Sequence, residues 1–435
     1  MQVALYTLGC KVNQFDTDII AQSFHDRGID IVPFNKRADI YVINTCTVTA
    51  RAAYQSRQMI RRAFRQNPGA RIIATGCYVQ ADACSLFEKV PPQVCLVGND
   101  SKSKLVEFAL RHPEGLECYV GDIYSCKSIA PELLVKPLER TRAFIRIQDG
   151  CNAFCSYCIV PYTRGPSRSL DPYFVLKQLD ILKGSGVQEV VLTGIHLGAY
   201  GLDLKPVTTI LDLLKEICAS DLGMRIRISS IEPSEVEPDL ISLIKFSGCI
   251  CHHLHLPLQS GSKVILSRMG RHYSPDDYAR LVLNIKSELP DAAIGADVLV
   301  GFPGETEEDF AKTFDFLSSL PITYIHAFPF SPRPGTVAET FPDRIPGPEK
   351  SKRVKALRKL SSEKRVSFYN NFIGQELSCL VESRPTRDGY LRAMSDNYVP
   401  VLIENNSGNQ GLVNKIVRIK IKRVDAELVF GEPCC

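Results

Sequence analysis

The sequence predicts an α/β protein of three units: a parallel α/β domain, an incomplete (β/α)6 barrel and a small all-β barrel. Two patterns lead to this prediction. Short apolar runs alternate with amphipathic helical stretches through most of the chain, which is typical of parallel sheets covered by helices. Towards the C-terminus, alternating apolar and polar residues separated by turn signals replace this pattern and favour a small β-barrel. With 435 residues, the chain is long enough for two or three domains.

The domain boundaries are expected where these patterns change. The parallel α/β domain is predicted at residues 1–125, the large barrel at 143–368 and the small β-barrel at 372–435. Residues 126–142 contain two prolines and several charged residues, and they are predicted to be a linker.

Each of the three clearest strands in the first domain ends next to a cysteine. The strands and their cysteines are Val3–Leu8 with Cys10, Ile40–Ile43 with Cys46, and Ile72–Thr75 with Cys77. The carboxyl ends of parallel strands lie on one edge of a sheet, so the three thiols are expected to meet there. Three convergent thiolates suggest an iron–sulfur cluster with one iron left open, whereas three buried cysteines without a metal are the alternative. The other cysteines of this domain lack the strand-end position and are not predicted to be ligands: Cys84, Cys95, Cys118 and Cys126.

Six strand–helix units in series predict the incomplete barrel, open along one side. The strands are expected at Ala143–Gln148, Glu189–Thr193, Arg225–Ser230, His253–Pro257, Ile294–Val300 and Tyr324–Pro329. Active residues of such barrels gather at the C-terminal ends of the strands. Glycines there let a ligand approach the backbone, and hydroxyls and carboxylates could bind its ribose and amino group. The candidates for cofactor binding are Thr193, Gly194, Ser229, Ser230, Glu232, Gln259, Asp297 and Gly301.

Two histidines share one face of the fourth barrel strand. His253 and His255 are separated by Leu254, which points to the opposite face. No further metal ligand is evident beside them, so packing or hydrogen bonding inside the barrel is favoured over a metal site.

A second cysteine triplet directly follows the first barrel strand. Cys151, Cys155 and Cys158 have the spacing C-x3-C-x2-C, and such a loop can wrap one iron–sulfur cube and fix three of its four irons. The fourth iron is then free to bind a small molecule. A zinc knuckle would need a fourth ligand from a second pair, and none stands at the expected spacing. A disulfide would need an oxidising compartment, which nothing else in the sequence suggests.

The sequence gives no sign of secretion or membrane insertion. The N-terminus lacks a basic and apolar leader, and no apolar run is long enough to span a bilayer. The chain is therefore expected in the cytoplasm, where its 16 cysteines would not form a disulfide framework.

The net charge of +4 is too small to identify a nucleic-acid partner, but the distribution of charge is more informative. Residues 40–81 contain arginines and no acidic residue, and basic side chains also cluster at residues 349–365 and near the C-terminus. A charge run is usually a solvated face. Here the clustering favours contacts with RNA phosphates. The candidates are Arg61, Arg62, Lys355, Lys415, Arg418, Lys420 and Lys422.

Taken together, the motifs resemble those of the radical S-adenosylmethionine (SAM) methylthiotransferases over essentially the whole chain. The matching segments are Thr7–Gln14, Asn44–Thr49, Thr75–Cys77, Gln148–Gly165, His255–Gly261 and Asp297–Glu305. The family has an N-terminal domain with three cluster cysteines, a central radical SAM barrel and a C-terminal TRAM domain that binds RNA. The resemblance therefore implies the same three domains here.

The resemblance also implies two [4Fe-4S] clusters and SAM as cofactors. The cluster on Cys151, Cys155 and Cys158 would cleave SAM to a 5′-deoxyadenosyl radical, which removes the hydrogen from carbon 2 of a modified adenine. The cluster on the N-terminal cysteines would present methylated sulfur to that carbon. An unactivated aromatic C–H bond is beyond side-chain acid–base chemistry, so no catalytic side chain is expected besides the cluster ligands.

Within the family, two segments resemble the branch that acts on threonylcarbamoyladenosine in tRNA. These are Lys11–Gln14, after the first cysteine, and Thr47–Thr49, after the second. The expected partners are a tRNA anticodon stem-loop and a low-potential electron donor, and the chain is expected to be a monomer. The alternatives are action on isopentenyladenosine in tRNA, or a non-catalytic iron–sulfur protein that binds RNA or transfers electrons.

Overall fold

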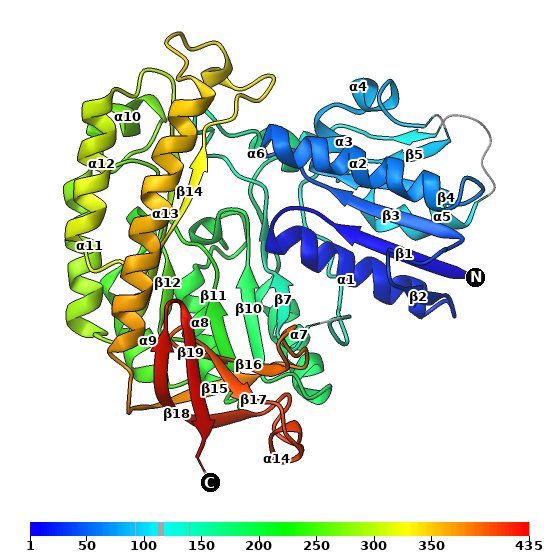
Figure 1. Cartoon of the computed structure of the whole chain (residues 1–435). Coiled ribbons are helices and arrows are strands. Elements are labelled where there is room, and N and C mark those ends of the chain that lie inside the picture. Colours follow the sequence, from blue (N-terminus) through cyan, green and yellow to red (C-terminus); the bar gives the residue numbers. More distant parts are fainter. Residues whose placement is uncertain (92, 112–116, 139, 435) are drawn as a thin grey trace.

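The computed structural model describes residues 1–91, 93–111, 117–138 and 140–434 (Figure 1). The three units follow one another in the order that the sequence predicts, and the predicted fold class is confirmed. None of the helices in the described ranges is both long enough and apolar enough to cross a membrane.

The N-terminal domain is a six-stranded parallel sheet with helices on both faces. In spatial order its strands are β2 (Asp30–Val32), β1 (Gln2–Thr7), β3 (Ile40–Thr45), β4 (Arg71–Gly76), β5 (Val94–Val97) and β6 (Cys118–Tyr119). One face is covered by α1 (Lys11–His25) and α5 (Leu105–Leu110), and the other by α2 (Ala50–Gln66), α3 (Cys77–Ala81) and α4 (Ala83–Phe87). Because β3 is covered on both faces, every one of its residues is buried, which explains its unbroken apolar run.

The central domain is the incomplete barrel. Its parallel strands are β7 (Ala143–Arg146), β10 (Glu189–Thr193), β11 (Arg225–Ile228), β12 (His253–His255), β13 (Ala293–Val300) and β14 (Tyr324–Pro329). They form two three-stranded sheets, which isolated bridges join between β11 and β12. Within the described residues β7 and β14 do not pair, so the barrel stays open along one side.

Helices cover the outside of this barrel. They are α7 (Pro172–Gly184), α8 (Ile210–Ala219), α9 (Pro238–Ser247), α11 (Pro275–Glu288) and α12 (Glu307–Ser319). The long helix α13 (Gly347–Asn370) packs along β14 and continues past residue 368, where the sequence patterns place the end of the barrel domain.

The first barrel strand ends earlier than predicted. Gln148–Asp149 forms a separate short strand, β8, that pairs antiparallel with β9 (Arg168–Ser169). The chain then turns at Gly150, where φ is +74° and an added Cβ would lie 1.9 Å from the carbonyl oxygen of Pro166. Only glycine fits this turn, which starts the loop of the second cysteine triplet.

The C-terminal domain is a closed five-stranded barrel. Its strands, in the order in which they pair, are β15 (Glu376–Val381), β16 (Tyr390–Ser395), β17 (Pro400–Glu404), β19 (Leu428–Pro433) and β18 (Ile416–Asp425). In Figure 1 this barrel lies at the lower ends of β7, β10 and β11, opposite the ends that carry the functional loops. The small β-barrel predicted from the alternating pattern is therefore present.

Two arginines of β11 attach the C-terminal barrel to the central one. Arg225 donates to the carbonyl oxygens of Ser378 and Met394, each at 2.9 Å. Arg227 donates in the same way to two further carbonyls of that barrel, at 2.9 and 3.0 Å. Both guanidinium groups also bind the buried carboxylate of Glu189, at 2.6 and 2.8 Å. The interface therefore depends on a carboxylate that neutralises charge inside the protein.

Residues 126–142, expected to be a linker, pack as an ordered strap in their described part, 126–138 and 140–142. Leu134 is fully buried, and its backbone exchanges two hydrogen bonds with the side chain of Gln178 on α7, at 2.6 and 2.7 Å. The neighbouring carbonyl of Leu133 accepts from Gln22 on α1 at 2.9 Å. The segment thus joins helices of two domains.

We expect Glu189→Gln to lower the free energy of unfolding by about 3 kcal/mol or more, because two buried guanidinium groups would lose their carboxylate. Burial alone would raise the pKa of Glu189, but Arg227 and Arg225 lower it to about 2. A carboxyl with a depressed folded-state pKa contributes stability above its unfolded pKa of about 4.3 and loses it as the pH falls towards the folded value. Urea unfolding should therefore show a difference between wild type and variant that shrinks below about pH 4.

The matched control is Glu288→Gln, which breaks an exposed pair with Lys245. This change should alter the free energy of unfolding by less than about 1 kcal/mol. If the difference in free energy of unfolding between the wild type and Glu189→Gln did not depend on pH, the proposed ionised state of Glu189 would be wrong.

Candidate functional site

A cavity of about 270 Å³ lies between the N-terminal domain and the barrel, and both domains line it. The N-terminal domain contributes all three cysteines of its triplet: Cys10, Cys46 and Cys77. The barrel contributes four of the residues predicted to bind the cofactor: Gly194, Ser230, Glu232 and Asp297. Side chains from separate domains thus meet at the carboxyl edge of both sheets, as the strand-end argument predicts.

The N-terminal cysteines occupy equivalent positions at the ends of three adjacent strands. Cys10 precedes the first residue of α1, Cys46 follows β3, and Cys77 is the first residue of α3. Gly76 makes the last of these turns possible, since its φ is +96° and an added Cβ would lie 2.5 Å from the carbonyl oxygen of Thr45. Parallel topology and short glycine turns are sufficient to bring the three thiols to one cavity.

Two of these thiols, Cys10 and Cys46, lie where a nearby cation would stabilise the thiolate form. Burial raises the pKa of Cys46 to about 12, and it also raises the pKa of Cys10. The guanidinium group of Arg164 opposes this rise at both cysteines. Thiolates are the metal-binding form of cysteine, so in such surroundings bound iron would supply the charge that stabilises them.

The second triplet lies on a loop that the barrel holds from two directions. The backbone N–H of Ser156 donates to the carbonyl of Met269 at 3.0 Å, and its carbonyl accepts from Ala338 at 2.7 Å. Burial raises the pKa of Cys155, and that of Cys158 to about 12. At Cys155 and Cys158, a bound cation would therefore stabilise the thiolate form.

Neither cysteine triplet is arranged as the ligands of a single metal ion would be. Among the described residues, only His255, Asp297 and His326 place three ligand atoms of His, Cys, Asp or Glu within 4.8 Å of one another. Neither cysteine triplet forms such a group, although a zinc ion would require it. In an iron–sulfur cube each thiolate binds a different iron, so wider spacing of the thiols is expected.

Two residues next to the second triplet were not predicted from the sequence. His196 Nδ1 lies 3.5 Å from Cys151 Sγ, and its Nε2 lies 2.6 Å from a carboxylate oxygen of Glu235. The Cys151 and Glu235 contacts raise the pKa of His196 to about 10. Because His196 follows the end of β10, the strand-end rule could have identified it.

The other residue is Arg271, which comes from the loop between α10 (Lys263–Arg268) and α11. Its Nη1 lies 3.7 Å from Cys155 Sγ and 2.9 Å from the carboxylate of Glu232. No sequence pattern marks this arginine, since it is brought to the site by packing alone.

The other four residues predicted to bind the cofactor, Thr193, Ser229, Gln259 and Gly301, are not among the residues that line the cavity. Thr193 and Ser229 are buried at the ends of β10 and β11, and the hydroxyl of Ser229 has no hydrogen-bond partner within the described part of the chain. Gln259 bonds through its backbone to β13, and Gly301 packs under the side chain of Lys350.

The histidines of the barrel strands form a hydrogen-bonded chain in its interior. The hydroxyl of Tyr324 lies 2.8 Å from His253 Nε2 and 3.1 Å from His255 Nδ1. Asp297 lies 2.9 Å from His255 Nε2 and 3.3 Å from His326 Nδ1, and these contacts hold its pKa well below the usual range although burial alone would raise it. His253 and His255 are therefore hydrogen-bonded inside the barrel, as predicted, but Asp297 and His326 lie close enough to His255 to be further metal ligands, which the sequence did not show.

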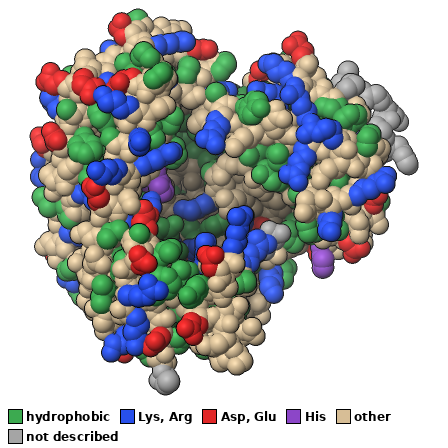
Figure 2. Space-filling model, viewed as in Figure 1, with side chains coloured by type: hydrophobic (Ala, Val, Ile, Leu, Met, Phe, Trp, Pro, Cys, Tyr) green, Lys and Arg blue, Asp and Glu red, His purple; other side chains and the backbone are tan. Residues whose placement is uncertain are grey.

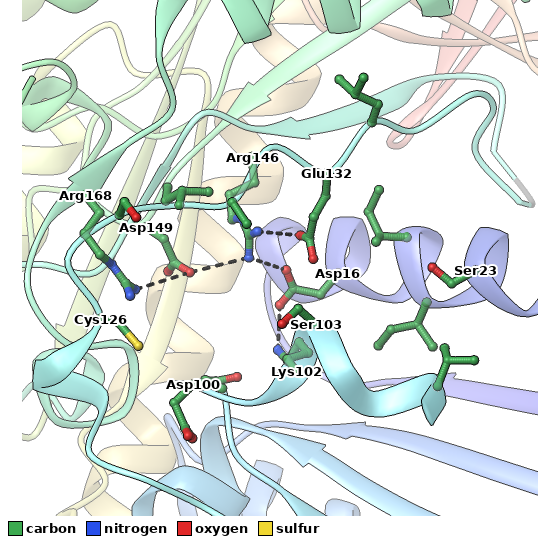
Figure 3. Close-up of a pocket in the computed structure, with 18 of the residues that line it drawn as sticks. Asp16, Ser23, Asp100, Lys102, Ser103, Cys126, Glu132, Arg146, Asp149 and Arg168 are labelled. Carbon is green, nitrogen blue, oxygen red and sulfur yellow. Dashed lines mark hydrogen bonds and ion pairs between the residues drawn. The ribbon is translucent and has the colours of Figure 1, made fainter. Parts of the chain in front are cut away.

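A buried network of charges fixes the two domains on either side of the cavity. In Figure 3, Arg146 lies between the carboxylates of Asp16, Asp149 and Glu132, and its contact with Asp16 measures 2.8 Å. Burial would raise the pKa of Asp16, but Lys102, Arg146 and Arg164 together hold it well below the usual range. The network borders a second cavity of about 390 Å³, which none of the six cysteines in the two triplets lines.

A second junction joins the Cys46 loop to the loop after β14. Arg333 Nη2 donates to Thr47 Oγ1 at 2.9 Å, and the backbone N–H of Ala50 donates to Ser331 Oγ at 2.9 Å. The N-terminal domain is therefore attached to both edges of the open barrel, and the cavity lies between the two attachments.

Most of the predicted RNA-binding residues are exposed. Arg62, Lys355, Lys415, Arg418, Lys420 and Lys422 are exposed, whereas Arg61 is half-buried. Arg61 donates to the carbonyl of Lys89 at 2.7 Å. Figure 2 shows Lys and Arg side chains on both sides of the central hollow, over α13 and over α2. In the basic helix α13, however, Arg353 is buried and bound to Glu305, so part of that charge is structural.

Comparison with protein families gives two matches. Residues 2–98 match the model described as "Uncharacterized protein family UPF0004", and residues 145–317 match the Radical SAM superfamily. These matches correspond to the N-terminal domain and to the barrel.

Similar proteins match the chain over nearly its full length. The Threonylcarbamoyladenosine tRNA methylthiotransferase MtaB of Aquifex aeolicus (strain VF5) is 40% identical, covering 97% of this chain and 100% of that protein. The protein of the same name from Bacillus subtilis (strain 168) is 39% identical, covering 96% and 93%. The tRNA-2-methylthio-N(6)-dimethylallyladenosine synthase of Moorella thermoacetica (strain ATCC 39073 / JCM 9320) is 31% identical, covering 98% and 97%.

Among solved structures, the chain resembles the radical S-adenosylmethionine methyltransferase TsrM of Kitasatospora setae, solved with cobalamin and a [4Fe-4S] cluster bound. The TM-score is 0.54 at 17% identity, with 78% of this chain and 77% of that chain covered. At this identity the likeness supports the fold only.

We expect Cys46→Ala to abolish iron binding by the N-terminal domain, whereas Cys95→Ala should not. The two cysteines are matched, since both are buried in the same sheet and burial raises the pKa of each to about 12. They differ in position, because Cys46 lies at the cavity and Cys95 lies inside β5. Iron and sulfide analysis after anaerobic reconstitution, compared with the wild type, measures the difference. Equal iron loss in both variants would contradict the assignment of ligands by strand-end position.

Proposed function

The chain belongs to the radical SAM methylthiotransferases, and on this premise we propose that it adds a methylthio group to carbon 2 of threonylcarbamoyladenosine next to the anticodon of tRNA. One observation carries the proposal: cysteines of the N-terminal domain and polar strand ends of the barrel line one cavity. Radical formation and sulfur transfer must act on the same carbon, so their sites must open onto a shared space.

Membership of this family implies a [4Fe-4S] cluster and SAM. Cys151, Cys155 and Cys158 are the residues that would hold that cluster, and we propose that Cys10, Cys46 and Cys77 hold a second one. When bound, these groups supply the radical chemistry and the methylthio sulfur that no side chain can provide.

The chain's own residues bind SAM, hold its ligands in place and shield the radical from water. Glu232 and Asp297, with the backbone at Gly194 and Ser230, are suited to bind the amino group and ribose of SAM at the cavity wall. Arg271 keeps the Glu232 carboxylate in place through their 2.9 Å contact. The walls contributed by the two domains exclude water from a reactive radical.

An anticodon loop is a suitable substrate for this cavity because its bases are single-stranded and can be unstacked. The exposed basic side chains near the hollow would bind the phosphates on either side of the inserted base. We infer that the enzyme acts as a monomer, since one chain carries both cysteine triplets and the basic surfaces. With tRNA as the substrate, a cytoplasmic location and a low-potential electron donor follow as parts of the proposal.

Isopentenyladenosine in tRNA is the second candidate substrate. A relative named as a dimethylallyladenosine synthase is 31% identical to this chain, which supports this candidate. A relative named for threonylcarbamoyladenosine is 40% identical, which favours the first candidate. A non-catalytic role in RNA binding or electron transfer is disfavoured, because it would leave the shared cavity without a use.

The substrate proposal is tested with the reconstituted protein, SAM, a reductant and two tRNAs. We expect conversion of tRNA that carries threonylcarbamoyladenosine and no conversion of tRNA that carries isopentenyladenosine, measured by mass spectrometry of the nucleosides. The Cys151→Ala/Cys155→Ala/Cys158→Ala variant is the control and should give neither product nor SAM cleavage. Methylthiolation of the isopentenyl form at a comparable rate would assign the chain to the other branch.

RNA binding by the C-terminal barrel is tested through its salt dependence. Lys415, Arg418 and Lys420 lie exposed along or beside β18, so replacing all three by Gln should weaken tRNA binding. The slope of log K against log salt should fall by about 2, because each lost phosphate contact removes about 0.7. The control replaces Lys177, Lys245 and Lys312, which are exposed on the outer helices α7, α9 and α12, and should leave the slope unchanged. Equal slopes for both triple variants would exclude β18 from the RNA interface.

A further inference from the structure

Three adjacent strands of the central barrel carry a cluster of two histidines and one aspartate. The residues are His255 on β12, Asp297 on β13 and His326 on β14. Asp297 and His326 are direct partners in the register of β13 and β14. His255 is the partner of Gly295, which lies two residues before Asp297 and so points to the same face of β13. The strand register therefore brings the three side chains together inside the barrel.

The donor atoms of this cluster are spaced like the ligands of one metal ion. Oδ1 of Asp297 lies 2.9 Å from His255 Nε2 and 3.3 Å from His326 Nδ1, and all three atoms lie within 4.8 Å of one another. An ion that binds nitrogen and oxygen at about 2.0–2.2 Å holds neighbouring ligand atoms about 2.8–3.6 Å apart. The two measured distances fall inside this range.

The other hydrogen bonds of His255 also suit a metal ligand. A ligating histidine usually donates its second ring N–H to a neighbouring oxygen, which fixes the ring. His255 Nδ1 lies 3.1 Å from the hydroxyl of Tyr324, which can accept this N–H while it donates its own proton to His253 Nε2 at 2.8 Å. Gly295 makes room for the tyrosine, since an added Cβ would lie 2.2 Å from its ring. The His255 nitrogen that faces Asp297 is then left to bind a cation.

The cluster extends from the barrel interior to the cavity between the domains. The exposed fraction of the side chain rises from 7% at His255 to 27% at Asp297 and 46% at His326. Asp297 is part of the cavity lining, and Figure 2 shows histidine side-chain atoms at the wall of the central hollow. An ion with three protein ligands and an open side keeps coordination positions for water or for a ligand in the cavity.

We propose that His255 Nε2, a carboxylate oxygen of Asp297 and His326 Nδ1 bind a divalent first-row transition-metal ion, such as zinc or iron(II), at the wall of this cavity. Two imidazoles with one carboxylate suit these ions, whereas magnesium and calcium prefer oxygen ligands alone. Both histidines contact Oδ1 of Asp297, so the second oxygen of this carboxylate can still serve the SAM site proposed above. The metal site uses no cysteine of either triplet and goes beyond the proposed function.

The test uses the full-length protein after anaerobic reconstitution, so that iron–sulfur clusters occupy the cysteines. After incubation with Zn²⁺ and desalting, elemental analysis should find about one zinc ion per wild-type chain. His326→Gln and Asp297→Asn should each lower the zinc affinity about tenfold or more, and so should Tyr324→Phe, which removes the hydroxyl next to His255. The sulfide content, which measures the clusters, should stay unchanged in all three variants.

The matched control is His252→Gln. His252 also lies near a carboxylate, 3.8 Å from Asp396, but within the described residues this pair has no third ligand atom close to it. The control should keep the zinc of the wild type.

X-ray absorption spectroscopy of the zinc in the wild-type protein tests the site without any substitution, and it should show nitrogen and oxygen ligands only. Sulfur ligands would mean that zinc has entered a cysteine triplet, and the proposed site would be wrong. Equal zinc in the wild type and His326→Gln, or no zinc in either, would show that the three side chains form hydrogen-bonded ion pairs and no metal site.

Discussion

The buried guanidinium group of Arg164 is the contact on which the relative placement of the two cysteine triplets depends. Arg164 belongs to α6 (Val160–Arg164), a short helix that begins just after Cys158. It donates to both oxygens of Asp149 at 3.1 Å, to Asp16 at 3.2 Å and to the side chain of Asn13. One side chain of the barrel thereby binds two residues of α1, the helix that follows Cys10.

Burying this charge network costs free energy unless every charge is paired, so the network favours one placement of the two domains. The free energy lost on removing charges from water is offset only where each charge meets a well-placed partner. Removing one partner of a buried pair lowers the stability by about 3–5 kcal/mol. Asp16 meets Lys102 of its own domain and Arg146 and Arg164 of the barrel at once, so two of its three ion pairs depend on how the two domains are placed. A reaction between groups held by separate domains needs positioning to a fraction of an ångström, and a satisfied charge network meets that need better than an apolar interface that can slide.

The same principle operates at the opposite end of the barrel. There Glu189 neutralises two arginines whose remaining N–H groups bind carbonyls of the C-terminal barrel. Charge is therefore compensated at both domain interfaces.

The sequence by itself determined the fold class, the three units and both cysteine triplets, because strand periodicity and parallel topology dictate that strand ends share one edge. Cys10, Cys46 and Cys77 could be grouped for that reason alone. The positions of Arg271 and Arg164 were decided only by the tertiary structure, since each contacts residues far away in the chain and no local pattern marks it. His196 follows the end of β10, so the strand-end rule could have marked it, but its contacts with Cys151 and Glu235 are visible only in the tertiary structure. The packing of residues 126–138 and 140–142 against two domains was also invisible in the sequence, because whether a polar group is paired or buried depends on which distant side chains pack against it.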